Sequence, residues 1–259
     1  MKQTIVIKCG GSIISELSES FFSSIRNLKT AGWNVVLVHG GGPDITNALK
    51  QMHIKTEFTD GQRKTTKEVM DVVQMILAGK LNKQLAGEFL KRGLNAVGLS
   101  GQDAGILCAE LLDEEKLGLV GTVTAVKTEF VELLLNNDYL PVVAPLGFTD
   151  DFEPLNVNAD AAAASIARQL NAEKLLFVTD VDGILREGKL IREMDAEQVH
   201  TLIDNGVISG GMIPKAEACL RSLSENLTEV MIVNGKKAFL EDNQFKGTKI
   251  EYKKEAAAG

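Results

Sequence analysis

The chain has 259 residues, of which 44% are apolar and 24% are charged, as in an ordinary globular protein. This length suits one large α/β unit or two closely packed lobes. The net charge of −7 gives no positive field for nucleic acid or an anionic membrane. No apolar run approaches the roughly 20 residues of a membrane span. The cysteines, at 9, 108 and 219, fit neither a disulfide framework nor a zinc site. We therefore expect a cytoplasmic protein without nucleic-acid or membrane partners.

Short apolar runs alternate with longer amphipathic runs along the chain. Strands are expected at 5–7, 35–38, 96–99, 141–144, 175–178 and 230–233, and a hairpin arm at 120–126. Helices are expected at 21–29, 45–52, 69–90 with an interruption near Gly79, 131–135, 159–170, 198–203 and 216–223. This rhythm predicts an α/β fold of three layers, in which helices cover both faces of a mostly parallel sheet.

Two glycine clusters follow two of the predicted strands, and a helix follows each cluster. The first is Lys8–Ser12 (KCGGS) and the second is His39–Pro43 (HGGGP). Glycines let the backbone approach a ligand closely, and the start of a helix offers unpaired N–H groups, so each cluster suits an anion. Neither cluster is a P-loop or a dinucleotide fingerprint, and a plain turn is the alternative for each.

Charged residues stand next to these and similar turns. Lys8 closes the first strand, where a solvated lysine is the ordinary explanation. Lys215 follows Gly210 and Gly211 at a predicted helix start, where acidic residues are usual, so a cation there favours a bound anion. Asp160 precedes an alanine-rich helix, and taken alone it is best explained as an N-cap. The segment Asp180–Gly183 follows a strand and is either a turn or a loop near a nucleotide.

Six motifs occur in the order found in the amino acid kinase family, which the chain resembles over essentially its whole length. They are Lys8-Cys9-Gly10-Gly11-Ser12, His39-Gly40-Gly41-Gly42, Gly61-Gln62-Arg63-Lys64-Thr65, Asn156-Val157-Asn158-Ala159-Asp160, Thr179-Asp180-Val181-Asp182-Gly183 and Gly210-Gly211-Met212-x-x-Lys215. Arg63 and the segment Asn156–Asp160 favour an N-acylated acidic amino acid as the acceptor. The resemblance implies transfer of the γ-phosphoryl group of ATP to the side-chain carboxylate of N-acetyl-L-glutamate. The products would be N-acetyl-L-glutamyl 5-phosphate and ADP, in the second step of arginine biosynthesis.

The resemblance also implies a role for each motif position. The groups implied to act on the transferred phosphoryl group are Lys8, Lys215, Asp160, which would hold both lysines, and the backbone N–H groups of Gly11 and Gly41. The groups implied to bind the acceptor are Gly41, Gly42, Arg63 on the α-carboxylate, and Asn156 near the amide. The implied nucleotide site comprises Lys8, Gly10, Gly11, Ser12, Thr179, Asp180, Val181, Asp182, Gly183, Ile184, Ser209, Gly210, Gly211 and Lys215. Mg²⁺ is expected on the phosphates and water, without a protein ligand.

The family resemblance further implies an open, mainly parallel eight-stranded sheet shared by two lobes. Residues 1–172 would bind the acceptor and form a homodimer, and residues 173–259 would bind ATP. Because few residues precede the first strand, inhibition by arginine is not expected. Lys253–Gly259 is expected to form a terminal tail.

A carboxylate acceptor suits this set of residues. With a solution pKa near ~4 it is already deprotonated at pH 7, so no general base is needed. Its repulsion from a phosphate at ~4 Å, roughly 4 kcal/mol per charge pair at an effective dielectric of 20, has to be offset by cations and amide dipoles.

Three alternatives remain open from the sequence. An N-modified aminoadipate or another acidic amino acid is an alternative acceptor within the family. The segment Leu176–Gly183 resembles the nucleophile loop of haloacid-dehalogenase-type phosphatases, although Ile184 replaces the usual threonine. A non-catalytic amino-acid-binding module on the same fold would not need both lysines and Asp160.

Overall fold

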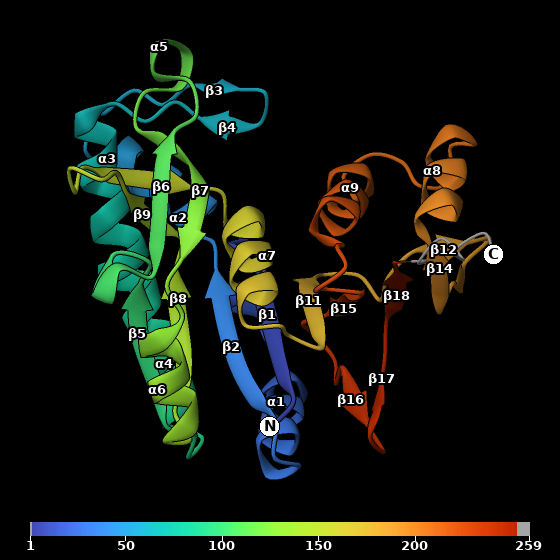
Figure 1. Cartoon of the computed structure of the whole chain (residues 1–259). Helices are drawn as coiled ribbons and strands as arrows, with labels where there is room; N and C mark the ends of the chain where they lie inside the picture. Colours follow the sequence, from blue (N-terminus) through green and yellow to red (C-terminus); the bar gives the residue numbers. More distant parts are fainter. Residues whose placement is uncertain (1, 253–259) are drawn as a thin grey trace, which may run out of the picture.

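The structure is a computed structural model and describes residues 2–252. An eight-stranded sheet forms its centre (Figure 1). In spatial order its strands are β14 (Glu193–Asp195), β18 (Thr248–Glu251), β15 (Glu229–Asn234), β11 (Lys174–Thr179), β1 (Thr4–Cys9), β2 (Asn34–His39), β8 (Leu140–Ala144) and β5 (Ala96–Ser100). The tail expected at 253–259 lies outside the described residues.

The predicted α/β fold with a mostly parallel sheet between helices is confirmed, but the sheet is mixed. β15 and β18 run antiparallel, whereas the other neighbouring strands run parallel. β15 is followed by the short hairpin of β16 (Leu240–Glu241) and β17 (Gln244–Phe245), which returns the chain directly beside β15. Antiparallel neighbours need only such a short connection, whereas parallel neighbours need a crossover.

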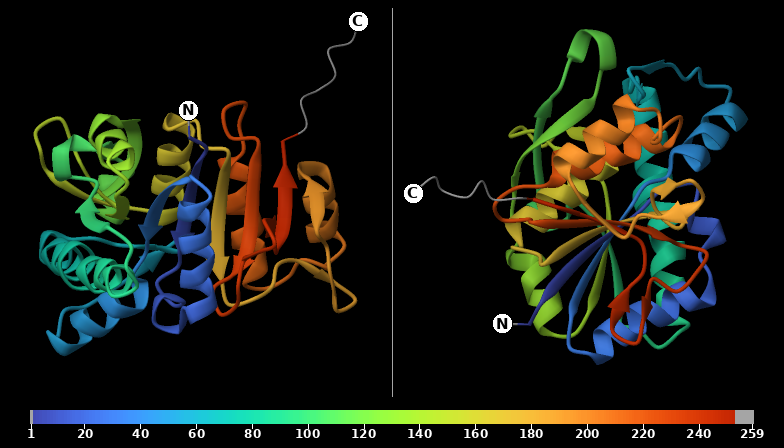
Figure 2. Two further views of the ribbon diagram at one scale, coloured as in Figure 1. Left: turned by 90° about the horizontal axis from the view of Figure 1, so that it is seen from below. Right: turned by 90° about the vertical axis from the view of Figure 1, so that its right-hand side faces the viewer.

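Helices cover both faces of this sheet, as the two views of Figure 2 make visible. They are α1 (Glu19–Thr30), α2 (Gly42–Gln51), α3 (Lys67–Gln74), α4 (Asn82–Leu90), α5 (Glu114–Leu117), α6 (Glu129–Asn136), α7 (Ala159–Gln169), α8 (Ala196–Asp204) and α9 (Met212–Ser222), with short 3₁₀ turns at Ile14–Glu16 and Asp103–Gly105.

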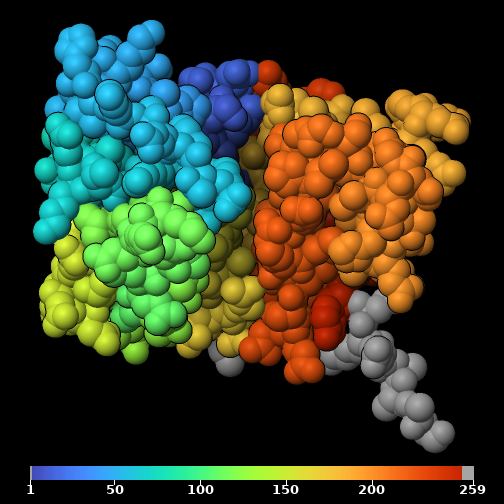
Figure 3. All heavy atoms as spheres, turned by 90° about the horizontal axis from the view of Figure 1, so that it is seen from above, coloured from blue at the N-terminus to red at the C-terminus, as the bar shows by residue number. Residues whose placement is uncertain are grey.

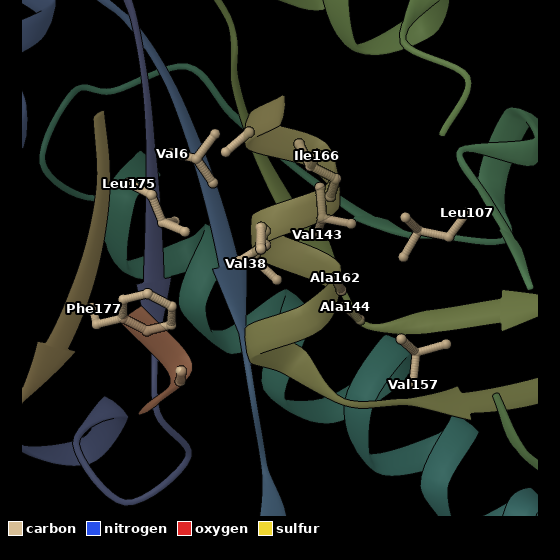
Figure 4. Close-up of a cluster of buried hydrophobic side chains, with 14 of the residues drawn as sticks. Val6, Val38, Leu107, Val143, Ala144, Val157, Ala162, Ile166, Leu175 and Phe177 are labelled. Carbon is tan, nitrogen blue, oxygen red and sulfur yellow. The ribbon is translucent and has the colours of Figure 1, made fainter. Parts of the chain in front are cut away.

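Alternate residues of the strands supply two separate hydrophobic clusters, one on each face. Val6 and Val38 belong to the cluster beneath α7, which also contains Ala162 and Ile166 (Figure 4). Odd-numbered residues of β1 join the second cluster, beneath α1 and α4. Because side chains alternate along a strand, the consecutive apolar residues Ile5, Val6 and Ile7 of β1 bury both faces of the sheet.

A small closed barrel of four strands lies beside the sheet. Its strands are β6 (Leu107–Leu111), β7 (Val120–Val126), β9 (Leu146–Phe148) and β10 (Pro154–Val157). The hairpin arm expected at 120–126 is confirmed, because β7 pairs with β6 in antiparallel register. Two further hairpins join β3 (Phe58–Thr59) to β4 (Gln62–Arg63) and β12 (Leu185–Arg186) to β13 (Lys189–Leu190).

The long helix expected at 69–90 is continuous, but its middle is a π-helix. This π segment, η2 (Met75–Leu81), joins α3 to α4 and contains Gly79. It is wider than an α-helix and changes which side chains face the sheet. π segments of this kind are frequent at functional sites.

Seen from above, the blue-to-green part of the chain lies on one side of the molecule and the orange-to-red part on the other (Figure 3). A recess runs between them, and the segment of α7 lies deeper in it. Within residues 2–252, no helix has both the length and the apolar character needed to cross a bilayer.

Candidate active site

The carboxyl ends of β1 and β2 bring the two glycine clusters together. β1 and β2 are parallel neighbours, with Cys9 opposite His39, so the turns that follow lie at the same edge of the sheet. Ligands of open α/β sheets bind at this edge. Lys8 Nζ lies 2.7 Å from Asp160 Oδ1 there, and the lysine side chain is only 16% exposed. The first strand and the start of α7 therefore share an ion pair.

The explanation of Asp160 as an N-cap is wrong. The N-cap of α7 is Asn158, whose side chain accepts hydrogen bonds from the backbone N–H groups of Asp160 and Ala161. The Asp160 carboxylate is therefore not occupied by capping. It lies in the first helical turn, where the helix dipole favours a negative charge, and its Oδ1 contacts Lys8.

The two glycine turns pack backbone against backbone. A Cβ on Gly11 would lie 2.8 Å from both N and Cα of Gly41, which is closer than real contacts allow. A Cβ on Gly41 would lie 2.5 Å from Leu81 Cδ1 and 2.6 Å from Leu77 Cδ2. Gly11 thus requires glycine because backbone atoms approach it closely, whereas a side chain at Gly41 would have to displace the two leucines that the π segment supplies.

A buried polar pair supports the second glycine turn from behind. His39 is fully buried, and its Nδ1 lies 2.9 Å from the carbonyl oxygen of Gly40. Its Nε2 lies 3.1 Å from Asn82 Nδ2, which also donates to the carbonyls of Leu99 and Val142. Because the Gly40 carbonyl can only accept, Nδ1 carries a proton and donates, while Nε2 faces the Asn82 amide nitrogen, whose two protons are shared among three acceptors. Burial lowers the pKa of His39, which favours the neutral form.

A cavity of about 250 Å³ opens beside the glycine turns. Six of the predicted residues line it, namely Lys8, Gly11, Gly41, Gly42, Arg63 and Asn156. Its apolar wall consists of Ile45, Phe58, Leu77, Val120, Pro145 and Val157. The volume suits a small molecule with a charged end and an apolar portion.

Arg63 is the buried cation of this cavity. The residue is only 7% exposed, and its guanidinium donates to Thr46 Oγ1 at 2.7 Å and to the Gly42 carbonyl at 3.1 Å. It also donates to Thr56 Oγ1 and stacks 4.6 Å from the centre of the Phe58 ring. Among residues 2–252, no carboxylate forms an ion pair with it. Burial without a counter-ion lowers its pKa, although arginine stays charged.

The second predicted lysine lies on the other side of the same sheet edge. Lys215, on α9, donates to Thr179 Oγ1, and its Nζ lies 3.4 Å from Asp180 Oδ1. Thr179 ends β11, the parallel neighbour of β1, so Lys8 and the partner of the Lys215 ammonium stand at the carboxyl ends of adjacent strands. The hydroxyl of Thr179 and, more weakly, the ammonium of Lys215 hold the pKa of Asp180 below its ordinary value.

The loop after Asp180 is held by side chains from the segment 234–248. Asp182 accepts hydrogen bonds from Lys237 Nζ at 2.8 Å and Asn234 Nδ2 at 2.7 Å, and these bonds lower its pKa. Gly183 has φ +136°, and a Cβ there would lie 2.5 Å from Thr248 Oγ1, so only glycine fits. Ile184 is buried and donates its N–H to Thr248 Oγ1. This part of the predicted nucleotide site is thus a loop whose conformation is fixed by these contacts.

The remaining predicted nucleotide residues lie in the turns after β1 and β11 and before α9. Gly210, with φ +55°, and Gly211 form the turn before α9, and Ser209 opens that turn through its carbonyl. Gly10 lies near Lys8, Ser12 is exposed, and Val181 is half-buried. The structure does not bring Lys215 into an ion pair with Asp160 among the described residues. A joint role of Asp160 in holding both lysines stays a prediction.

Sequence reasoning missed several residues that support the site. They are Thr65, Asn82 as the partner of His39, Asn158 as the cap, and Leu77 with Leu81. Thr65 and Asn158 stand inside the quoted motifs, as does His39, which borders the glycine cluster and was expected to orient it. Asn82, Leu77 and Leu81 pack from elements far away in sequence.

The described residues contain no group of three or more His, Cys, Asp or Glu side chains placed to hold a metal ion. The carboxylates nearest the two lysines, Asp160 and Asp180, are each engaged by an ammonium group.

A family model described as "Amino acid kinase family" matches residues 3–234. The chain belongs to the amino acid kinase family. This match includes every motif of the site, so the Asp180–Gly183 segment belongs to the same family pattern as the glycine turns. The phosphatase alternative has no support in it.

Relatives in the amino acid kinase family match the chain from end to end. A protein of Bacillus velezensis named "Acetylglutamate kinase" is 51% identical over 258 residues, which cover 100% of both chains. A crystal structure of smu.665 from Streptococcus mutans superposes with a TM-score of 0.84 at 33% identity, covering 97% of this chain and 99% of that chain.

The fold also occurs in a family structure with a different name. N-acetylglutamate synthase from Neisseria gonorrhoeae, complexed with coenzyme A and N-acetyl-glutamate, superposes with a TM-score of 0.82 at 22% identity, covering 97% of this chain and 60% of that chain. At this identity the likeness concerns the fold alone. The chemistry of the present chain has to be argued from its own site.

Proposed function

We propose that the protein transfers the γ-phosphoryl group of ATP to the side-chain carboxylate of N-acetyl-L-glutamate. A carboxylate oxygen attacks the γ-phosphorus, the bond from that phosphorus to the bridging oxygen breaks, and ADP leaves. No proton moves in this step, because the attacking carboxylate is already ionised at neutral pH. Full-length relatives near 50% identity carry the name of this activity, which supports the proposal.

The observation that carries the proposal is the buried guanidinium of Arg63. A cation at 7% exposure with neutral partners is costly unless a ligand supplies the counter-charge. A planar guanidinium matches a carboxylate through two parallel hydrogen bonds. The cavity beside it is small and carries apolar side chains on its other walls. An acidic amino acid with a neutral, partly apolar amino substituent fits this combination.

Lys8 and the glycine turns stand where the second carboxylate of such an acceptor would meet a phosphate. Lys8 lines the same cavity as Arg63, together with Gly11 and Gly41. Its ammonium and the N–H groups of the turns are fixed before the substrate arrives. Fixed donors aimed at developing charge are the usual source of rate enhancement in phosphoryl transfer.

The nucleotide belongs on the Lys215 side of the edge, over residues 179–184 and 209–211. Lys215 and the backbone of the Gly210 turn offer positive charge without a cluster of protein metal ligands. Mg²⁺ would reach the site on the phosphates and neutralise part of their charge. Two lobes, with residues 1–172 for the acceptor and 173–259 for ATP, and a cytoplasmic homodimer remain part of this proposal.

The test is a coupled ADP-release assay over a panel of acidic amino acids, with and without N-acetylation. Trapping of the acyl phosphate with hydroxylamine identifies the bond that forms. We expect hydroxamate only with ATP and N-acetyl-L-glutamate. Preference for an N-modified aminoadipate would replace the acceptor, and release of phosphate from simple phosphoesters without ATP would replace the reaction.

A further inference from the structure

Thr65 lies at the junction of three chain segments around the acceptor cavity, and it is fully buried. Its N–H donates to the Leu117 carbonyl at 2.7 Å, and its own carbonyl accepts from Leu119 N–H at 2.7 Å. Gly118, between them, has φ +67°, and a Cβ there would lie 2.4 Å from the Thr65 carbonyl oxygen. The backbone of Thr65 is therefore locked between β4 and the start of β7.

The hydroxyl of Thr65 joins two residues that line the cavity. It donates to the Arg63 carbonyl at 2.8 Å, so its single proton is already used. It can then act only as an acceptor toward Asn156, whose Nδ2 lies 3.0 Å away. The direction of the second bond is thus fixed by the first, independently of how the amide would be oriented in isolation.

This chain of bonds decides which end of the Asn156 amide is offered to a ligand. Nδ2 is committed to Thr65, and no residue of 2–252 donates to Asn156 Oδ1. Asn156 lines the cavity and is held in place by its own N–H, which donates to the Leu119 carbonyl at 2.9 Å. The cavity therefore presents a hydrogen-bond acceptor at this position.

We propose that Thr65 is a positioning residue for acceptor binding, which orients the Asn156 amide with its oxygen toward the substrate and ties it to the backbone of Arg63. The inference rests on the proposed function. The acceptor would then be selected for an N–H group at its α-substituent. An ester oxygen in place of that N–H would face Asn156 Oδ1 with no proton between them, because both atoms are hydrogen-bond acceptors.

The experiment compares kcat/KM for N-acetyl-L-glutamate and for 2-acetoxyglutarate, in which the amide N–H is replaced by an ester oxygen. We expect the wild-type protein to prefer the amide by about tenfold, the value of one hydrogen bond at a desolvated site. Thr65→Val keeps the shape and removes the hydroxyl, so the preference should fall toward one. Thr65→Ser keeps the hydroxyl and should restore it. The KM for ATP should change little in either variant.

A purely structural role predicts a different result. Ser24→Ala removes another buried hydroxyl that donates to a carbonyl and accepts backbone N–H groups, far from the cavity. It should lower stability and leave the amide preference intact. If Thr65→Val does not fold, Thr65→Cys, which keeps a side chain of similar size but bonds weakly, takes its place.

A double-variant cycle checks that Thr65 acts through Asn156. In the background of Asn156→Ala, adding Thr65→Val should leave the amide-to-ester ratio unchanged. An unchanged ratio in Thr65→Val alone, no amide preference in the wild type, or an additive effect in the double variant would each overturn the inference. Absence of any activity toward N-acetyl-L-glutamate in the wild type would instead overturn the proposed function.

Discussion

The acceptor side and the nucleotide side of the candidate site are built from different interactions. On the acceptor side, Arg63 and Asn156 are held by hydroxyl and carbonyl groups in a largely buried network. On the nucleotide side, Lys215 pairs with Asp180, and their side chains are 40% and 60% exposed. Buried hydrogen bonds are little affected by salt, whereas exposed ion pairs are weakened by it. The acceptor pocket is thus preorganised, and the nucleotide loop depends more on its surroundings.

The largest effect is expected for Lys8→Ala, at the boundary of the two sides. Removing one fixed cation at the transferred group should lower kcat by roughly 10²–10³. Lys29→Ala is the matched control, because Lys29 forms a 2.8 Å ion pair with Asp138 and its side chain is only 9% exposed, but it does not line the cavity. Steady-state kinetics of both variants provides the test. A kcat near the wild-type value in Lys8→Ala would remove this lysine from the mechanism.

Arg63→Lys should sharpen the description of the acceptor side. Lysine keeps the charge but cannot form two parallel bonds, so the KM for the acceptor should rise roughly tenfold or more, with the KM for ATP unchanged. Arg92→Lys serves as control, since Arg92 also stacks on an aromatic ring, 4.0 Å from the centre of Phe22. Equal changes in both Michaelis constants would contradict an acceptor-specific role.

Lys215→Ala should act on the opposite side. We expect the KM for ATP to rise about tenfold at low salt, the value of one charge-assisted bond at a partly exposed site. The difference from wild type should shrink in high salt, because the interaction is accessible to screening ions. Lys116→Ala, which removes an exposed 3.4 Å pair with Asp113, provides the control. A salt-independent effect would show that the nucleotide side is as shielded as the acceptor side.

His39→Gln tests how the buried pair of His39 and Asn82, behind the acceptor side, makes the stability of the protein depend on pH. Because burial lowers the pKa of His39, the unfolded chain binds a proton below pH ~6.5 while the folded chain does not. Stability should therefore fall as the pH decreases from about 6.5 toward the lowered pKa. The variant has no histidine at this position and lacks this loss. The difference in the free energy of unfolding between the two proteins should therefore change by about 1 kcal/mol between pH 7 and pH 5.5. Chemical denaturation measures it, with His200→Gln as control.

The smallest effect is expected for Asp182→Asn, on the nucleotide side. Asp182 and Lys237 are 45% and 63% exposed, so their pair contributes at most about 1 kcal/mol, or a few degrees in Tm. Thermal unfolding at low and high salt measures this contribution. A larger loss would mean that the loop is fixed by this carboxylate and not by Gly183 and Thr248.

The sequence contained most of the fold and most of the residues at the sheet edge. Apolar strands ending in glycines predicted where Lys8 and Gly41 would lie, because local chain geometry controls both. The position of Asp160 was recognised, but its capping role was wrong, since Asn158 two residues earlier makes the cap bonds. A run of Asn, Ala and Asp offers two capping residues, and only the backbone at the helix start decides between them.

What the sequence could not give depends on contacts between distant segments. Thr65 reaches Asn156 across 91 positions, and Asn82 reaches His39 across 43. The π segment lies in an ordinary helical sequence pattern, so nothing in the spacing of its apolar residues distinguishes it from an α-helix. The single antiparallel neighbour in the sheet likewise follows from how the chain returns after β15.

The packing of Leu77 and Leu81 onto Gly41 has a consequence for redesign. A side chain at Gly11 would displace the backbone of Gly41 and Gly42, and one at Gly41 would displace Leu77 and Leu81, so neither position readily accepts a larger residue. Attempts to retune the protein for longer or bulkier acceptors must begin at the rim, at Ile45, Phe58 and Val120. The residues at the sheet edge would then stay unchanged while the size of acceptor that the pocket accommodates is altered.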